Sequence, residues 1–134
     1  MGRWSVLSAG RVVACMDPAA PATQVLQAAA RLAEDLRTSW YAVYVTPRAW
    51  TRACASHSAL SDNIRAAQQL GGIVVHVTAD RPELGVSAFA DREGATHVIF
   101  GQHQRRPRWH RSTAAELRRT IRSAALVPVD LEDE

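Results

Sequence analysis

The chain has 134 residues, of which 47% are hydrophobic and 22% charged, and its net charge is +3. This length fits one domain with its own core, and the composition is that of a folded globular protein rather than a disordered chain. No apolar run approaches the ~20 residues that a membrane-spanning helix needs, and no stretch has the pattern of a signal peptide, so we expect a cytoplasmic protein.

All 16 basic residues are arginine. The absence of lysine excludes a Schiff-base lysine and the lysine of a P-loop. The two cysteines, Cys15 and Cys54, lack zinc-ligand spacing, and no two of the five histidines are three or four residues apart. We therefore expect no metal site. Without a secretion signal, both cysteines are expected to be reduced. Cys15 lies in an apolar run, which favours a core position over a nucleophilic role.

The first half of the chain alternates between strand and helix patterns. Residues 1–10 have no periodicity, and we expect a leader or a disordered terminus there. Arg11–Met16 is a short apolar run before an Asp-Pro turn, which indicates a buried parallel strand. From Thr23 to Leu36 apolar residues recur every three or four positions, as in an amphipathic helix. Ser39–Val45 is aromatic and β-branched and therefore predicts a second strand.

The second half continues the alternation. Apolar spacing and turn residues predict a helix from Leu60 to Leu70, a strand over Ile73–Val77, a helix over Pro82–Arg92, a strand over His97–Phe100 and a helix over Ala114–Ala125. Gly71 and Gly94 are expected to end the first two of these helices, and Ser112 or Thr113 to cap the third. Leu126–Val129 is expected to be an edge strand because Pro128 cannot donate a hydrogen bond. Residues 130–134 form an acidic tail.

The order of five strands and four helices predicts an α/β fold. Such alternation with short connections favours a three-layer sandwich, Rossmann-like or flavodoxin-like, in which right-handed crossovers join a five-stranded parallel sheet. Ligands of such sheets bind outside the carboxyl ends of the strands, where the strand order reverses. We therefore expect the functional site at the end of the fourth strand, around Gly101 and the arginine-rich segment behind it.

Four segments carry a family resemblance: Val12–Pro18, Trp40–Pro47, Gln69–Gly71, and Ile99–Gly101 with the following Arg-Arg-Pro-Arg-Trp run. Together they resemble the universal stress protein domain, and more narrowly its version in the cytoplasmic region of KdpD-type potassium-responsive sensor histidine kinases. The resemblance covers residues 11–129, which we treat as one domain. It implies the adenine nucleotide alpha hydrolase-like fold, with strand order 3-2-1-4-5.

The resemblance also implies a function. A domain of this kind would be a non-catalytic regulatory or sensory module that tunes the output of a sensor kinase, because the chain has no kinase core of its own. Its partners would be the other domains of such a kinase, or a second copy in a homodimer through the last strand, Val127–Val129. It would lie in the cytoplasm, either free or tethered to the inner membrane within a larger sensor. The alternative is a stand-alone universal stress protein that binds ATP.

The nucleotide signature of this family is incomplete in the chain. ATP-binding members have Gly-x2-Gly-x9-Gly-[Ser/Thr] after the fourth strand; Gly101 fills the first position, but Gln104 and Ala114-Ala115 replace the others. Arginines surround the same place, and guanidinium groups bind phosphate through paired hydrogen bonds. We expect ATP or another adenine nucleotide as ligand, without metal. The predicted ligand-binding residues are Asp17, Pro18, Tyr44, Gly101, His103, Arg105, Arg106, Arg108, Arg111, Ser112 and Thr113.

Other interpretations stay open. The arginine-rich loop is compatible with a solvated loop that has no ligand, or with contact to an acidic partner protein. Asp17 either contacts the adenosine part of a ligand or caps the turn after its strand. Cyclic di-AMP is not expected, because the Ser-x-Ser pattern of the branch that binds it is replaced by residues 17–19. A further alternative is phosphate-backbone binding, to nucleic acid or an anionic membrane, through this loop and the Arg118, Arg119, Arg122 helix face. Nucleic acid is disfavoured because Trp109 is the loop's single aromatic residue.

Overall fold

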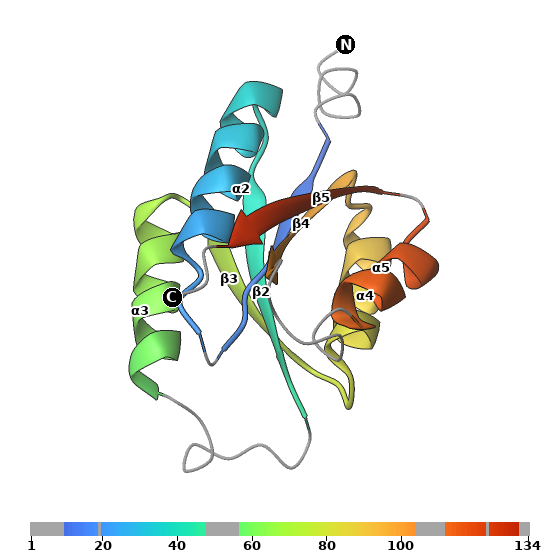
Figure 1. Ribbon diagram of the computed structural model, residues 1–134. Coiled ribbons are helices and arrows are strands. Elements are labelled where there is room, and N and C mark those ends of the chain that lie inside the picture. The colour runs from blue at the N-terminus through green and yellow to red at the C-terminus, as the bar shows by residue number, and fades with distance from the viewer. Residues whose placement is uncertain (1–9, 19, 48–56, 104–111, 123, 132–134) are drawn as a thin grey trace.

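The computed structural model describes residues 10–18, 20–47, 57–103, 112–122 and 124–131. Within these ranges strands and helices alternate in the expected order (Figure 1). In chain order they are β1 (Val12–Cys15), α2 (Thr23–Leu36), β2 (Trp40–Thr46), α3 (His57–Gln69), β3 (Ile73–Thr78), α4 (Pro82–Glu93), β4 (His97–His103), α5 (Ser112–Thr120) and β5 (Ala125–Leu131).

The five strands form one sheet in the order β3-β2-β1-β4-β5, and every neighbouring pair is parallel. Helices α2 and α3 cover one face of the sheet, and α4 and α5 cover the other (Figure 1). The predicted three-layer α/β fold and its strand order 3-2-1-4-5 are confirmed. The arrangement follows from the sequence because strands buried on both faces need the near-continuous apolar runs that this chain has.

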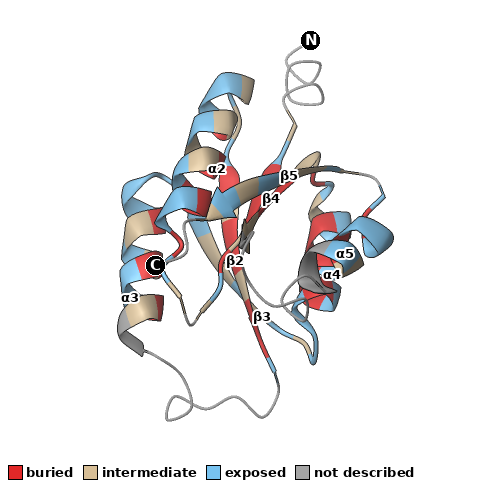
Figure 2. Cartoon of the chain, in the orientation of Figure 1, coloured by how far each residue is buried: buried red, intermediate tan, exposed pale blue. Residues whose placement is uncertain are grey.

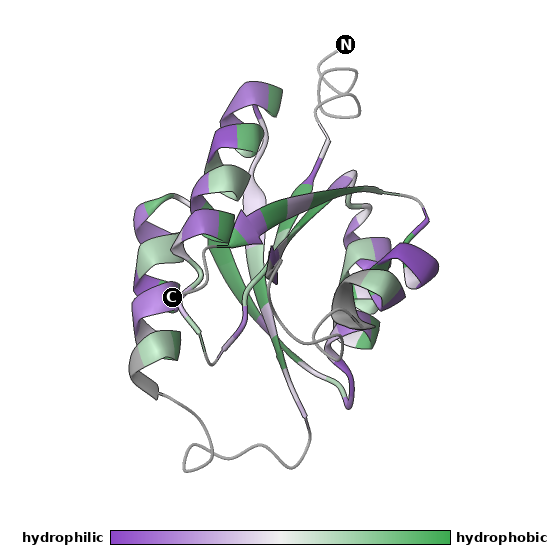
Figure 3. Cartoon of the chain, viewed as in Figure 1, coloured by the Kyte–Doolittle hydropathy of each residue, from purple (hydrophilic) through white to green (hydrophobic). Residues whose placement is uncertain are grey.

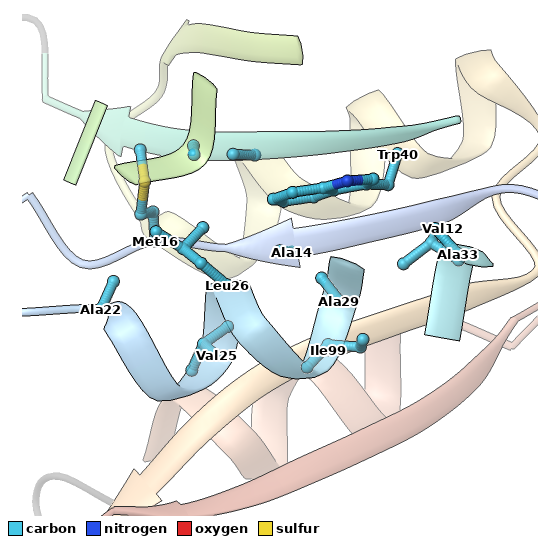
Figure 4. Close-up of a cluster of buried hydrophobic side chains, with 12 residues drawn as sticks. Val12, Ala14, Met16, Ala22, Val25, Leu26, Ala29, Ala33, Trp40 and Ile99 are labelled. Carbon is cyan, nitrogen blue, oxygen red and sulfur yellow. The ribbon is translucent and has the colours of Figure 1, made fainter. Parts of the chain in front are cut away.

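The core on the α2–α3 face is built around β1 and the first turns of α2 (Figure 4). Val12 and Ala14 of the strand belong to the same cluster as Leu26 and Ala29 of α2, and all four are fully buried. The Trp40 ring of β2 completes this layer. Burying one aliphatic side chain of valine or leucine size contributes about 1.5–3 kcal/mol, so this face supplies much of the stability.

The core on the opposite face joins the sheet to α4 and α5. Its almost fully buried residues come from both layers. The strands contribute Val13, Val43, Val98 and Phe100; α4 contributes Val86 and Phe89, α5 contributes Leu117, and Ile121 follows α5. Figure 2 shows the buried residues on the sides of the helices that face the sheet, and Figure 3 shows that the strands are largely hydrophobic. The apolar residues of the strands therefore serve two cores at once, one on each face.

Residue type and burial disagree along α4. Leu84 and Ala88 are apolar yet exposed, whereas Glu83 and Ser87 are polar yet buried. The reason is that α4 packs against both the sheet and α5, so the buried part of the helix is wider than a single apolar stripe. The Glu83 side chain is therefore buried between α4 and α5, although charged residues usually lie on the surface.

Several element boundaries also differ from the sequence-based expectation. The last helix ends at Thr120 rather than Ala125, because Ala125 pairs with His97 and donates its N–H to the Thr96 carbonyl at 2.8 Å. The fourth strand continues three residues beyond Phe100, and its partner β5 runs to Leu131. Parallel pairing of these two strands thus extends through Gly101 and includes Asp130, which the sequence pattern assigns to the acidic tail.

Candidate functional site

The point where the strand order reverses lies between β1 and β4. These two strands are neighbours in the sheet, yet α2, which follows β1, covers one face while α5, which follows β4, covers the other (Figure 1). The two connections therefore leave the carboxyl edge in opposite directions, and this point is the usual ligand position in an open α/β sheet. This is the place at which the sequence predicts a site.

The β1 side of the site is the segment from Met16 to Pro21. The Met16 N–H donates to the Val43 carbonyl at 2.7 Å, which continues the pairing of β1 with β2 beyond the last strand residue. Asp17 follows with an exposed side chain, and Pro18 is half-buried. Pro18 and Pro21 restrict the backbone here and remove two N–H donors from the segment. Asp17 is thus presented at the strand end, where the sequence predicts a ligand contact.

The β4 side of the site begins at Gly101, which belongs to the strand. A Cβ atom at this position would lie 2.6 Å from Leu131 Cδ1 and 3.2 Å from Val25 Cγ2, closer than side chains normally approach. The packing of β5 and α2 over the strand therefore explains the glycine without any phosphate contact. The next residue, Gln102, donates from Nε2 to Asp130 Oδ1 at 2.9 Å and joins β4 to β5 near their ends.

The remaining predicted residues of the β4–α5 connection are described only in part. His103 ends β4, and Ser112 and Thr113 form the first positions of α5, so the helix already includes both residues that we expected as its cap. Arg105, Arg106, Arg108 and Arg111 lie outside the described residues. Their role as ligand-binding residues stays a prediction. The structure does bring the two ends of their segment to the carboxyl edge beside the end of β1.

Tyr44 has its own surroundings on the α3 face of β2. Its ring stacks on the His76 imidazole of β3, with ring centroids 4.6 Å apart and ring planes inclined by 5°. The His76 Nε2 atom in turn lies 2.7 Å from the hydroxyl oxygen of the buried Thr46. Tyr44 is therefore held by a neighbouring strand, with β1 between its own strand and β4. Its predicted ligand contact remains untested.

Cys15 ends β1 on the face covered by α4 and α5. Desolvation by burial raises the pKa of its thiol to about 12. The thiol is therefore protonated at neutral pH, and because the thiolate is the nucleophilic form, this agrees with the predicted packing role.

An ionic bridge links the starts of α4 and α5. The Glu83 carboxylate, whose side chain is 5% exposed, pairs with Arg81 Nε at 2.6 Å. The other end of the same guanidinium, Nη2, lies 3.6 Å from Glu116 Oε2 on α5. Glu116 also pairs with Arg119. Both helices begin at the carboxyl edge, so the bridge fixes one side of the candidate site.

Asn63 is the residue at the site that the sequence interpretation missed. It lies on α3, is 3% exposed, and contacts the backbone of the β1–α2 segment through three hydrogen bonds. One signal was available: Leu60, Ile64 and Ala67 form the apolar stripe of the helix, and Asn63 falls on that stripe. A polar residue in the buried stripe of an amphipathic helix needs a hydrogen-bonding partner.

Two structural features are absent from the described ranges. No group of three or more histidine, cysteine, aspartate or glutamate side chains is placed to hold a metal ion among these residues. No helix in the same ranges is both long and apolar enough to cross a bilayer.

Comparison with known proteins gives weak sequence similarity and strong similarity of fold. No family model matches the chain. Sensor protein KdpD of Escherichia coli strain K12 is 29% identical over 106 residues, which cover 78% of this chain and 12% of that protein. Sensor protein KdpD of Clostridium acetobutylicum is 26% identical over 97 residues, covering 72% of this chain and 11% of that protein. The chain therefore spans about an eighth of the length of these relatives.

Solved structures of universal stress proteins superpose over most of the chain. One, in complex with cAMP, has a TM-score of 0.69 with 14% identity and covers 92% of this chain and 98% of that one. The protein from Archaeoglobus fulgidus has a TM-score of 0.68 with 18% identity, covering 94% and 97%. Its structure in complex with dAMP has a TM-score of 0.63 with 20% identity, covering 89% and 95%. The chain has the universal stress protein fold, and weak sequence similarity relates it to a segment of KdpD sensor proteins.

Proposed function

We propose that this chain is a non-catalytic regulatory domain of a KdpD-type sensor kinase, which binds an adenine nucleotide between the ends of β1 and β4. The observation that carries the proposal is the geometry of this edge, where the Asp17 turn and the start of the arginine-rich connection lie on adjacent strands. Two universal stress proteins of the same fold are described with cAMP and with dAMP. The KdpD assignment is supported by the two sequence relatives.

Each part of the proposed site has a chemical role. The Asp17 carboxylate would accept hydrogen bonds from ribose hydroxyl groups. Arg105, Arg106, Arg108 and Arg111 would bind the phosphates by charge-assisted hydrogen bonds, with backbone N–H groups at the start of α5 as further donors. Arginine side chains would then take the place of the glycine-lined backbone that the family signature provides. His103, Ser112, Thr113 and Pro18 would complete the walls of the site.

Calorimetric titration with ATP tests the nucleotide part of the proposal. We expect saturable binding to the wild-type chain. The paired substitution Arg106→Ala and Arg108→Ala should weaken binding at least tenfold, because two charge-assisted hydrogen bonds are worth more than the ~1.4 kcal/mol that corresponds to that factor. The paired substitution Arg31→Ala and Arg65→Ala, at exposed positions of α2 and α3, removes the same two charges and is the control for a simple change in net charge. Absence of heat at millimolar ATP would remove nucleotide binding and leave contact with an acidic partner protein.

The regulatory part has two further readouts. Incubation with ATP should release no phosphate above the rate without protein, since the proposed site binds and does not cleave. The gene should encode a histidine-kinase core beyond this segment; a gene without one would favour the stand-alone universal stress protein instead.

Phosphate-backbone binding is a second candidate, favoured by the exposed arginines of the α5 region. Arg118 and Arg119 lie on α5, and Arg122 follows it, all three exposed. Two of these guanidinium groups already have partners: Arg118 lies 5.9 Å from the Phe100 ring centroid, and Arg119 pairs with Glu116. This candidate therefore ranks second. Its test is retention of a duplex oligonucleotide or of anionic vesicles, which should weaken steeply with added salt.

A further inference from the structure

The β1–α2 segment, which carries Asp17, depends on a side chain from another helix for its backbone hydrogen bonds. Asn63 of α3 accepts the Ala22 N–H at its Oδ1 atom at 3.0 Å. Its Nδ2 atom donates to the Ala20 carbonyl at 2.8 Å and to the Asp17 carbonyl at 3.2 Å. One buried amide thus holds three backbone groups of the segment, more than 40 positions away in the sequence.

The segment has few internal means of holding the same conformation. Pro18 and Pro21 contribute no N–H, and Ala22, the N-cap residue of α2, makes no side-chain capping bond. In a capping box the N-cap N–H is bound by a side chain of the helix's own first turn. Here Asn63 does this from α3. The start of α2 and the position of Asp17 are therefore set by the same amide group.

We infer that Asn63 is a positioning residue for the nucleotide site, which holds Asp17 and the β1–α2 segment in the conformation that binds ligand. This inference rests on the proposed function. Without the amide, the segment would populate other conformations, and the apparent affinity would fall by the fraction of molecules still competent to bind. Asn63 does not touch the ligand in this scheme, because its whole polar end is directed at the backbone.

The substitution Asn63→Asp tests the inference because it keeps the shape and changes the donors. The new carboxylate can still accept the Ala22 N–H but faces the carbonyl oxygens of Asp17 and Ala20. When the new carboxylate is protonated, its O–H can again donate one hydrogen bond to one of these carbonyl oxygens. A buried carboxyl group takes up its proton at a higher pH than an exposed one. We expect the Kd for ATP to be about tenfold that of wild type at pH 8 and within about threefold at pH 5, one hydrogen bond accounting for the difference.

The charged groups other than residue 63 are the same in both proteins, Asp17 among them. The ATP phosphates change charge with pH in both titrations, so the quantity compared is the ratio of the two Kd values at each pH. Asp62 and Arg65 flank Asn63 on the exposed side of α3. Asp62→Asn is the matched control, since it changes charge by one unit at the adjacent position and should leave the ratio near one at every pH.

The outcomes separate the inference from the proposed function. If the wild-type chain does not bind ATP, the proposed function fails and the inference fails with it. If wild type binds and Asn63→Asp binds equally well at pH 8, the inference alone is wrong. A pH-independent loss would also overturn it, because that result indicates general damage. Should Asn63→Asp not fold, hydrogen exchange on wild type decides: bound ATP should slow exchange of the Ala22 amide, and an unchanged rate would overturn the inference.

Discussion

At the scale of single residues, the buried polar groups show where sequence type and environment conflict. Asn63 lies in an apolar helix stripe but is hydrogen-bonded to backbone groups, and the buried Thr46 hydroxyl is hydrogen-bonded to the His76 side chain. Ser87 of α4 differs from both: it is 8% exposed, and in the described part of the chain its hydroxyl oxygen is the one buried side-chain polar atom without a hydrogen-bond partner. A buried hydroxyl without a partner costs free energy of folding.

Ser87→Ala is therefore expected to stabilise the protein. Removing the hydroxyl should raise the free energy of unfolding by about 1 kcal/mol or more, because it removes a desolvation penalty of about 1–3 kcal/mol. The measurement is the urea midpoint at constant m value. Ser61→Ala, at an exposed position of α3, is the control that isolates the gain of about 0.5 kcal/mol from helix propensity alone. Equal gains at the two positions would contradict the prediction.

The raised pKa of Cys15 gives a second prediction at this scale. A thiol whose pKa is about 12 contributes very little thiolate at pH 7.5, so iodoacetamide should modify Cys15 at least about a hundredfold more slowly than a free cysteine. Mass spectrometry of the peptide that contains Cys15 measures the rate. In urea the rate should rise to that of free cysteine. Fast modification of the folded protein would show that the thiol is not desolvated.

At the scale of elements, the turn between α3 and β3 can pack against β2 because residue 72 is a glycine and has no side chain. Gly71 ends α3 with a positive φ of 89°, as its position predicts, but the role of Gly72 is different. A Cβ atom on Gly72 would lie 2.7 Å from two atoms of the Trp40 ring, which is 3% exposed and has no room to move. The pairing of these elements thus requires a glycine beside the largest side chain of the core.

Gly72→Ala should lower the free energy of unfolding by about 1–3 kcal/mol, the usual cost of overpacking a core. The same substitution in a Trp40→Leu background should cost much less, because the flexible leucine leaves space for the methyl group. Urea unfolding of the four proteins in this double-mutant cycle gives the coupling directly. If the cost of Gly72→Ala is the same in both backgrounds, the contact with Trp40 is not its cause.

At the scale of the whole molecule, the sheet has two edges with different properties. The β3 edge carries Ile73, 48% exposed, and the stacked His76. The β5 edge carries Pro128 and ends beside the candidate site, where Leu131 packs against Gly101. An unpaired strand edge can pair with another chain. The homodimer through the last strand stays a prediction, and β5 is the edge at which it is expected.

Sedimentation equilibrium at tens of micromolar should therefore give twice the mass of one chain. Pro128→Lys places a charge at an exposed position of β5 and should shift the equilibrium to monomer, because association would bury that charge. Thr78→Lys at the exposed end of β3 is the matched control and should leave the dimer intact. A monomeric mass for wild type, or loss of the dimer in the control variant, would count against pairing through β5.

The sequence by itself determined the order of elements, the parallel sheet and the edge at which a site is expected. This was possible because apolar period and turn residues are local properties, and because a strand buried on both faces needs an uninterrupted apolar run. The ends of elements were less accurate. The local sequence pattern extends the last helix to Ala125. In the structure Ala125 instead pairs with His97 in the sheet, a contact between distant residues that no local pattern contains.

The tertiary structure alone decided how the candidate site is held. Asn63 and Ala22 are 41 positions apart, and Gly101 and Leu131 come from different strands. The sequence suggested a phosphate-loop glycine at Gly101 and a ligand contact for Tyr44; the structure adds a packing reason for the first and a stacked partner, His76, for the second. Such contacts escape sequence reasoning because one residue type suits several environments, and only the folded backbone brings the two partners into contact.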